Sequence, residues 1–453
     1  MDNKRGFASR LGFIMSMAAF SIGIGNLWKF PYVVGNNGGG AFLLIYLLMV
    51  VLVGVPGFLI EITLGRSAQL SPISGMRRLE GKKKTPWIAI GIVGCAAIFI
   101  IVSYATTIVG GWTLGYILKV IDGSLSGLSA EEIANVFGGF SGNPKIMIYA
   151  AVEVLLLWIC LVSGVKKGVE KICSILLPLL FVIMIGLAVY SNALPGAFSG
   201  LMWYLTPDFS AVTASSIAAA ATQVLFSIGI GMCCAYVYGS YITKNSNMVK
   251  SVALTAVLDT LVAVLAGLIC VPALFAFGIE PTAGPSLIYI TLPHLFNEMG
   301  SFGNVFGALF MLCVFFAGFT SILGGSEALV AVLCDSGKMK RKAAATLVVV
   351  AQFLFGFLFT LSFGGGVVSK FRALGMGLFD FFDFISSACL CLGALLMVLY
   401  VVFRWGFDKF REEANQGSSG VFRIRKWMKG YFCFVYPVVL VIVIYCIISG
   451  YLL

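Results

Sequence analysis

Charged residues are scarce in this sequence. They make up 11% of its 453 residues, whereas a soluble domain carries about 25%. The mean hydropathy is +1.02, and the apolar residues gather in long runs. This composition excludes a soluble globular fold and predicts an all-α protein that crosses a membrane many times.

Metal-binding and catalytic patterns are missing as well. The single histidine, His294, excludes a histidine-rich metal site. The 12 cysteines lie almost entirely within apolar runs and lack the paired spacing of zinc sites or disulfide frameworks. The sequence has no P-loop, nucleophile elbow or HExxH motif. We therefore expect a protein that is not an enzyme.

Eleven apolar runs are each long enough to cross a bilayer of about 30 Å. They cover approximately residues 11–34, 38–65, 87–121, 146–163, 171–190, 212–240, 251–278, 302–333, 343–362, 374–403 and 430–452. If the N-terminus is inside, 25 of the 30 basic residues lie on the inner side, as the positive-inside rule requires. The net charge of +11 then reflects orientation in the cell inner (plasma) membrane, and no nucleic-acid partner is expected. This topology predicts a cytoplasmic N-terminus and an extracellular C-terminus.

The hexapeptide FSIGIG occurs twice, at Phe20–Gly25 and at Phe226–Gly231. Each copy places two glycines inside an apolar run, where each glycine costs a regular helix about 1 kcal/mol. Residues two apart do not share a helix face, so this spacing favours an unwound turn over a packing stripe. The copies lie in the first and the sixth run, which are an odd number of crossings apart, so the two helices cross in opposite directions. We therefore expect one transport domain with inverted five-helix repeats at 11–190 and 212–403, and an additional helix at 430–452.

An unwound turn leaves backbone N–H and C=O groups without partners, and each costs several kcal/mol in hydrocarbon. Half-helix N-termini attract carboxylates, whereas half-helix C-termini and bare carbonyls attract cations. A zwitterion together with small hard cations fits both kinds of end. Ser21, Asn26, Gln223 and Ser227 lie close to the glycines in sequence, and their oxygens suit an alkali cation.

Longer segments around these glycines resemble the neurotransmitter:sodium symporter family, whose fold is that of a bacterial leucine transporter. They are RLGFIMSMAAFSIGIGNLWKFPY (Arg10–Tyr32), NNGGGAF (Asn36–Phe42), GVPGFLIEITLGR (Gly54–Arg66), GGWTLGY (Gly110–Tyr116), QVLFSIGIGM (Gln223–Met232), FFAGFTS (Phe315–Ser321) and FDFFDF (Phe379–Phe384). The resemblance covers nearly the whole chain, although such proteins usually have twelve helices. It is greatest to bacterial transporters of multiple hydrophobic amino acids. It implies a symporter that imports neutral hydrophobic L-amino acids, aliphatic and aromatic, by alternating access.

The resemblance also implies two sodium sites. The first would use the side chains of Ser21, Asn26, Ser227 and Asp259 with the substrate carboxylate. The second would use backbone oxygens and hydroxyls of Ala19, Ile22, Ala317, Thr320 and Ser321. The family usually has asparagine where this chain has Asp259, and a carboxylate in mid-span is a functional candidate. We hypothesise that Asp259 supplies a permanent negative charge, so that chloride is not required; an aspartate satisfied by helix–helix hydrogen bonds is the alternative.

The substrate pocket follows from the same family pattern. It would be formed by Phe20, Ser21, Ile24, Gly25, Ile100, Tyr104, Phe226, Ser227, Gly229, Met232, Ser321 and Gly325. The Tyr104 hydroxyl would bind the substrate carboxylate, but its distance along the chain from Trp112 requires a bulge or a shift in this helix. Gly229 and Gly325 would leave room for aromatic side chains. No acid is positioned for the ammonium of a biogenic amine.

The family pattern implies gates at both ends of the pocket. Lys29 and Asp383 would form the outer pair, unless they are two solvated charges worth little to each other. On the inner side, Lys4 or Arg5 would pair with Asp335, and Phe7 would cap the path.

Three residues of the helices would support these gates. Glu61 would brace the unwound part of the first span by accepting its freed N–H groups. Gly168 and Pro178 would let the fifth span loosen and admit water to the second sodium, with an ordinary proline kink as the alternative. Glu153, near the start of its run, is expected at the membrane interface, and Glu327 is a candidate polar contact.

Two other functions remain compatible with this pattern. An amino-acid sensor could use the same scaffold and binding residues. A proton-coupled carrier could share the fold, although Thr320 and Ser321 without a neighbouring basic residue favour sodium. We expect one copy of the chain to suffice for transport.

Overall fold

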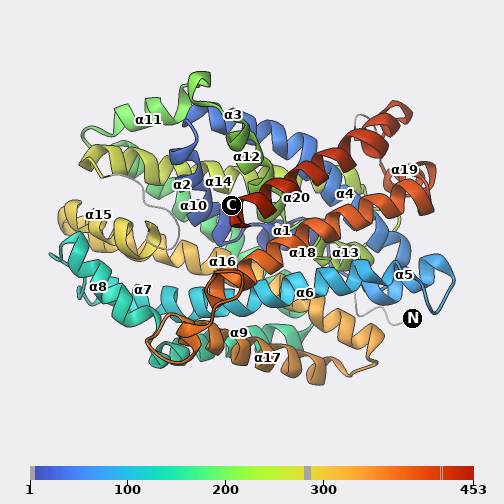
Figure 1. Cartoon of the computed structure of the whole chain (residues 1–453), viewed down its shortest axis with the longest axis horizontal. Helices are drawn as coiled ribbons and strands as arrows, with labels where there is room; N and C mark the ends of the chain where they lie inside the picture. The colour runs from blue at the N-terminus through green and yellow to red at the C-terminus, as the bar shows by residue number, and fades with distance from the viewer. Residues whose placement is uncertain (1–5, 280–286, 419, 421, 453) are drawn as a thin grey trace.

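Helices make up almost all of the described chain. The computed structural model describes residues 6–279, 287–418, 420 and 422–452 (Figure 1). Within these ranges the only strand-like features are two isolated bridges, which pair Gly39 with Pro207 and Ala373 with Met376. The predicted all-α class is confirmed.

The α-helices are numbered along the chain. The first ten are α1 (Arg10–Ser21), α2 (Phe30–Asn36), α3 (Gly40–Met49), α4 (Val55–Ala68), α5 (Pro72–Glu80), α6 (Ile88–Ala105), α7 (Leu114–Ile121), α8 (Ala130–Ser141), α9 (Met147–Ser163) and α10 (Lys171–Asn192). The next ten are α11 (Ala197–Leu205), α12 (Ala214–Ile228), α13 (Cys234–Ser240), α14 (Met248–Phe277), α15 (Leu292–Glu298), α16 (Gly303–Ser336), α17 (Arg341–Ser362), α18 (Leu378–Tyr400), α19 (Phe407–Asn415) and α20 (Tyr436–Leu452).

Shorter helical segments join or extend these helices. The π-helical ones are η1 (Gly25–Lys29), η2 (Val50–Gly54), η3 (Thr106–Thr113), η5 (Val165–Glu170), η7 (Leu287–Thr291), η10 (Val401–Trp405) and η12 (Tyr431–Val435). The 3-10 turns are η4 (Pro144–Ile146), η6 (Phe209–Ala211), η8 (Gly300–Phe302), η9 (Val368–Lys370) and η11 (Lys426–Met428).

Nine continuous helical runs of the described chain are long and apolar enough to cross a membrane. They are Gly40–Ala68, Ile88–Ile121, Pro144–Ser163, Val165–Asn192, Met248–Phe277, Gly303–Ser336, Arg341–Ser362, Leu378–Trp405 and Lys426–Ser449. A further span consists of α1 and Gly25–Asn36, which are bent by 54°, and the predicted run at 212–240 consists of α12 and α13. The polytopic class is confirmed, while the division into inverted repeats at 11–190 and 212–403 stays a prediction.

Both FSIGIG copies interrupt a helix, as predicted. α1 ends at Ser21, and the following Ile22 is extended, with φ −71° and ψ 101°. In the break after α12, Gly229 and Gly231 have positive φ angles of 73° and 92°. A side chain at Gly231 would also clash with the backbone oxygen of Leu390 in α18. Glycine is required there by the backbone conformation and by the close approach of the neighbouring helix.

Short helices mark the two ends of the molecule. Figure 1 shows α5 and α19 at one end of the molecule, and α8 and α15 at the opposite end. The basic pair Arg77 and Arg78 belongs to α5. At the other end, the backbone N–H and the hydroxyl of Ser129 hydrogen-bond to Glu132 and lower the pKa of its carboxyl. The end with α5 and α19 corresponds to the predicted inner side.

The third span contains the bulge that its sequence requires. η3 is a π-helical segment that begins two residues after Tyr104 and contains Trp112, and a π-turn widens the helix and shifts the face that follows it. Trp112 Nε1 donates to the backbone oxygen of Ser141 at 3.0 Å, and its ring meets Tyr289 edge-on. The bulge therefore lets Tyr104 face the interior while Trp112 packs against the helices beyond it.

Glu153 is fully buried, so its expected place at the interface is wrong. α9 packs on η3, and the carboxyl group lies against Gly110. Within the part of the chain that the structure describes, neither carboxyl oxygen of Glu153 has a hydrogen-bond partner. The prediction failed because position along the run does not tell which face of α9 the residue occupies.

Candidate functional site

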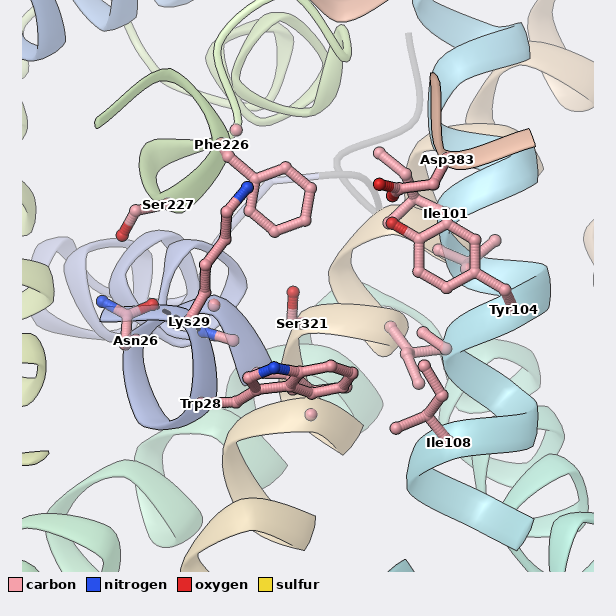
Figure 2. A pocket seen from close by; sticks show the side chains of 18 of the residues that line it. Asn26, Trp28, Lys29, Ile101, Tyr104, Ile108, Phe226, Ser227, Ser321 and Asp383 are labelled. Atoms are coloured by element: carbon pink, nitrogen blue, oxygen red, sulfur yellow. Dashed lines mark hydrogen bonds between the residues drawn. The ribbon is translucent and has the colours of Figure 1, made fainter. Parts of the chain in front are cut away.

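A cavity of about 360 Å³ lies where the two helix breaks meet α6, α16 and α18. Figure 2 shows Ile101, Tyr104 and Ile108 of α6 and η3 facing Lys29 and Asn26 across this space. Most of the predicted pocket residues line it, namely Phe20, Ser21, Ile24, Gly25, Tyr104, Phe226, Ser227, Gly229, Met232 and Ser321. The structure thus brings ten of the twelve predicted substrate residues together.

The third span lines the cavity with a different face from the one predicted. Its lining residues are Ile98, Ile101, Val102, Tyr104, Ala105 and Ile108, and Ile100 is not among them. Tyr104 lies at the edge of this helical face, so a residue one turn earlier falls outside it. Ile100 is therefore a corrected prediction, and Ile101 and Val102 take its place.

Gly325 does not line the cavity either. A Cβ atom added there would lie 2.7 Å from the side chains of Ile98 and Val102. Gly325 therefore lets α16 approach α6 closely, and its predicted role in the pocket is corrected. Gly229 does lie at the cavity, where an added Cβ would come within 2.8 Å of the Phe20 ring.

A polar cluster joins both helix breaks to α14. Asn26 Nδ2 donates to Asp259 Oδ1 at 3.0 Å, and Ser227 Oγ donates to Asp259 Oδ2 at 2.8 Å. Asn26 Oδ1 accepts the backbone N–H of Gly23 at 3.2 Å. The carboxylate of Asp259 is thus buried and satisfied by side chains from two other spans. Three of the four residues predicted for the first sodium are directly bonded here, and the fourth, Ser21, lines the same cavity.

A second group of oxygens lies between α1 and α16. Thr320 Oγ1 lies 3.0 Å from the backbone oxygen of Ala19 and 3.2 Å from that of Ala317. A Cβ added at Gly23 would lie 3.1 Å from Ser321 Oγ, so this hydroxyl also adjoins the break. A hard cation such as sodium prefers a site in which all the ligands are oxygen atoms. These two helices therefore bring together oxygens of Ala19, Ala317, Thr320 and Ser321, and their role in binding a second sodium stays a prediction.

Glu61 braces the other helix break from the one predicted. Its Oε2 accepts the N–H of Gly231 at 2.8 Å, and its Oε1 accepts that of Tyr236 at 3.4 Å. Both donors belong to the break after α12 and to the first turn of α13. The prediction that Glu61 supports the first span is wrong, because the N–H groups that it accepts belong to the break after α12 and to the start of α13. In the first span, Gln223 Nε2 donates to the Gly25 carbonyl at 3.1 Å.

Charged residues lie where the cavity reaches the start of α18. Lys29, Asp380 and Asp383 line it there. Figure 2 shows Lys29 and Asp383 on opposite sides of the space, and the Lys29 ammonium lies 5.0 Å from the centre of the Phe226 ring. The two residues of the predicted outer pair therefore face each other across the cavity, and the ammonium of Lys29 lies over the Phe226 ring.

A group of aromatic rings packs behind Phe20 of the cavity, whose ring meets that of Tyr238 edge-on. Phe7 meets Phe13 and Tyr238 edge-on, with ring centres 5.2 and 5.6 Å apart. Asp335 accepts the backbone N–H of Ser71 at 2.8 Å. Its predicted partners, Lys4 and Arg5, lie outside the described residues. These contacts place Phe7 in the aromatic group, and its capping of the inner path stays a prediction.

Glu327 is buried and belongs to an ion-pair network next to Tyr241. Arg341 Nη1 and the Tyr241 hydroxyl each donate to Glu327 Oε1 at 3.0 Å. The network links α16, the start of α17 and the residue that follows α13. Glu327 therefore makes the polar contact that was predicted for it, and its partner is the charged Arg341.

The fifth span is helical on both sides of Gly168 and Pro178. Gly168 belongs to η5, and Pro178 lies inside α10. A side chain at Gly168 would clash with the backbone oxygen of Cys160 in α9. Close packing alone therefore requires this glycine, and the predicted loosening of the segment stays a prediction.

The chain matches one family model over nearly its full length. The model describes the Sodium:neurotransmitter symporter family and matches residues 4–137 and 132–452. The chain belongs to this family. As a symporter of a sodium-dependent transporter family it is not an enzyme.

Individual relatives also align with this symporter over most of its length. An uncharacterized sodium-dependent transporter, YhdH of Bacillus subtilis, is 35% identical over 91% of both chains. The sodium-dependent serotonin transporter of Drosophila melanogaster is 26% identical over 97% of this chain and 75% of its own. The crystal structure of MhsT in complex with L-phenylalanine has a TM-score of 0.86 and 35% identity, and covers 98% of this chain and 100% of its own.

The sequence analysis did not predict some of the residues that line the cavity or that bind Glu327. Trp28, Tyr32 and Asp380 line the cavity, and Arg341 binds Glu327. Trp28 and Tyr32 belong to the GNLWKFPY segment and Asp380 to FDFFDF, so the motifs already contained the signal. Arg341 offered no such signal, because a basic residue at the inner end of a span is expected on topology alone.

Proposed function

We propose that this symporter couples sodium to the import of neutral hydrophobic L-amino acids, aliphatic and aromatic. The observation that carries the proposal is the meeting of the two helix breaks with the cluster of Asn26, Ser227 and Asp259 beside one cavity. Broken helices present backbone charge to a zwitterion at mid-membrane. The similarity to MhsT, which was solved with L-phenylalanine, supports a ligand of this class.

The lining of the cavity supports an apolar substrate side chain. Ile98, Ile101, Val102, Phe226 and Met232 contribute hydrocarbon or thioether surface. The two acids, Asp380 and Asp383, line the part near the start of α18. A buried apolar pocket disfavours a charged side chain, because burying an unpaired charge is costly. Flexible Met232 would allow substrates of different shape.

Two sodium ions are proposed to accompany the substrate. Asn26, Ser227, Ser21 and Asp259 would hold the first near the substrate carboxylate, and Asp259 would supply the negative charge that makes chloride unnecessary. Ala19, Ile22, Ala317, Thr320 and Ser321 would hold the second. The all-oxygen donor sets at both places suit a hard cation.

Alternating access would use the two ends of the cavity. Lys29 and Asp383 would approach when the outer path closes. Phe7 and the Glu327–Arg341 network would separate when the inner path opens. One copy of the chain in the plasma membrane, with its N-terminus in the cytoplasm, would be sufficient.

Uptake into proteoliposomes tests the proposal. The purified protein is reconstituted, and labelled L-leucine, L-phenylalanine, L-tryptophan, L-alanine, L-glutamate and L-lysine are offered under an inward sodium gradient or an inward proton gradient. We expect sodium-driven uptake of the neutral apolar amino acids only. Binding without flux would favour the sensor, and uptake under the proton gradient alone would favour the proton-coupled carrier.

A further inference from the structure

The first helix begins against a carboxylate from another span. Glu170 Oε2 accepts the backbone N–H of Ala8 at 2.6 Å. Glu170 Oε1 accepts the backbone N–H of Ser9 at 3.2 Å and lies 3.3 Å from the Ser9 hydroxyl. Glu170 is almost completely buried. Three hydrogen bonds therefore join the fifth span to the start of α1.

The start of α1 is shaped to receive this carboxylate. A side chain at Gly12 would occupy the same space as the Glu170 carboxyl group. Ser9 is the N-cap of α1, and its hydroxyl accepts the N–H of Gly12 at 2.9 Å. A negative charge is favourable at a helix N-terminus, where free N–H groups carry partial positive charge. The contact is therefore a satisfied, charge-assisted interaction.

Glu170 lies in the π-helical segment at the start of its span. It is the last residue of η5, which follows Gly164, whose φ angle is +91°. The regular helix α10 begins only at the next residue. A π-helical turn is rare and often lies at a functional segment. Any loosening of η5 would move the carboxylate that holds α1.

The other end of α1 is held by the second group of oxygens. Ala19 lies in the last turn of α1, and its carbonyl is bonded to Thr320 Oγ1. α1 has 12 residues and is a rod of about 18 Å. It is thus fixed at one end by Glu170 and at the other by the proposed sodium site on α16. A rigid helix fixed at two points tilts only when one of them is released.

We propose that Glu170 is a positioning residue for transport, which holds α1 against the fifth span until η5 loosens. Release of Glu170 from Ala8 and Ser9 and the inward swing of α1 are then one event, and sodium at the other end of α1 opposes it. The inference rests on alternating access in the proposed function but does not depend on which amino acid is carried.

A native cysteine reports on this movement. Cys173 of α10 is buried, and α10 packs against α1, so this cysteine becomes accessible when α1 leaves the fifth span. Cys313 of α16 is also buried and serves as an internal control for unfolding. The protein is placed in nanodiscs without amino acid and treated with N-ethylmaleimide, in sodium or in potassium, and modification of each cysteine is followed by peptide mass spectrometry.

Glu170→Gln is the main variant, because it keeps the shape and removes the charge. Glu170→Asp keeps the charge and shortens the reach. Lys167→Gln is the matched control, because Lys167 is exposed on the same segment and the change is also one unit of charge. We expect Glu170→Gln to raise the rate of Cys173 modification in sodium roughly tenfold, as loss of a charge-assisted contact implies. Cys313 stays protected, and the control behaves as the wild type.

The same variant is predicted to need more sodium for half-maximal uptake while its preference among amino acids stays unchanged. A purely structural cap would leave the sodium dependence unaltered. Protection of Cys173 equal to the wild type in Glu170→Gln, or parallel exposure of Cys173 and Cys313, would overturn the proposal. If Glu170→Gln does not fold, Glu170→Asp decides on the same criteria. If the wild type takes up no amino acid but shows the sodium-dependent protection of Cys173, the proposed substrate fails and the positioning role stands.

Discussion

Asn26 and Asp259 are bonded side chain to side chain across two spans, with Asn26 Nδ2 3.0 Å from Asp259 Oδ1. Asn26 Nδ2 also donates to the backbone oxygen of Asp259 at 3.1 Å. Asn26 follows the first helix break, so this bond ties that break to α14. The pair places a carboxylate where a sodium ion and a substrate carboxylate are proposed to meet.

The charge of Asp259 is predicted to set the sodium and chloride dependence. Asp259→Asn keeps the shape and removes the charge, which costs about 2 kcal/mol and lowers apparent sodium affinity roughly thirtyfold. Chloride should partly restore the affinity of this variant and have no effect on the wild type. Sodium activation of uptake, measured in chloride and in gluconate, checks both expectations. Collapse of wild-type uptake in gluconate would contradict them.

Gly229 and Gly325 are predicted to respond differently to the same substitution. Gly229→Ala adds a methyl group beside Phe20 and strains a backbone with φ of 73°, so tryptophan uptake should fall before alanine uptake. Gly325→Ala presses on Ile98 and Val102, so it should lower uptake of all substrates together with thermal stability. The ratio of tryptophan to alanine uptake distinguishes the two. An unchanged ratio in Gly229→Ala would count against its place in the pocket.

Glu61 is predicted to be necessary for the break after α12. Glu61→Ala leaves the N–H groups of Gly231 and Tyr236 without this acceptor, and each buried unsatisfied group costs about 1–3 kcal/mol. Thermal unfolding of the purified protein should show a clear loss of stability. Asp408→Ala is the control, because the exposed Asp408 pairs with Arg411 within one helix and such a surface pair is worth about 1 kcal/mol or less. Equal stabilities of the two variants would contradict this role.

The negative charge of Glu153 is predicted to be unnecessary for stability and for transport. Its carboxyl has no hydrogen-bond partner within the described chain, so Glu153→Gln removes no bond and keeps the shape. We expect unchanged or raised thermal stability and unchanged uptake. Glu153→Lys should destabilise strongly, because it buries a larger unpaired charge against Gly110. A large loss of uptake in Glu153→Gln would show that the carboxyl group itself is needed.

The sequence predicted the spans, the two breaks and the bulge near Tyr104, because glycine spacing and apolar length are local properties. It also predicted ten cavity residues, through the resemblance of whole segments. It failed for Ile100, because Tyr104 lies at the edge of the face of α6 that lines the cavity, and for Gly325, because α16 packs closely on α6 there. It failed for Glu61, because a carboxylate binds the nearest free N–H groups, and only the packing shows that these belong to the break after α12 and the start of α13.

Sodium-driven accumulation of labelled L-phenylalanine in proteoliposomes is the most direct test of the proposed function. The measurement uses an inward sodium gradient in gluconate, with choline in place of sodium as the control. We predict transient accumulation above the external concentration, which disappears when the sodium gradient is collapsed. Accumulation that is absent in sodium, or equally large in choline, would contradict the proposal.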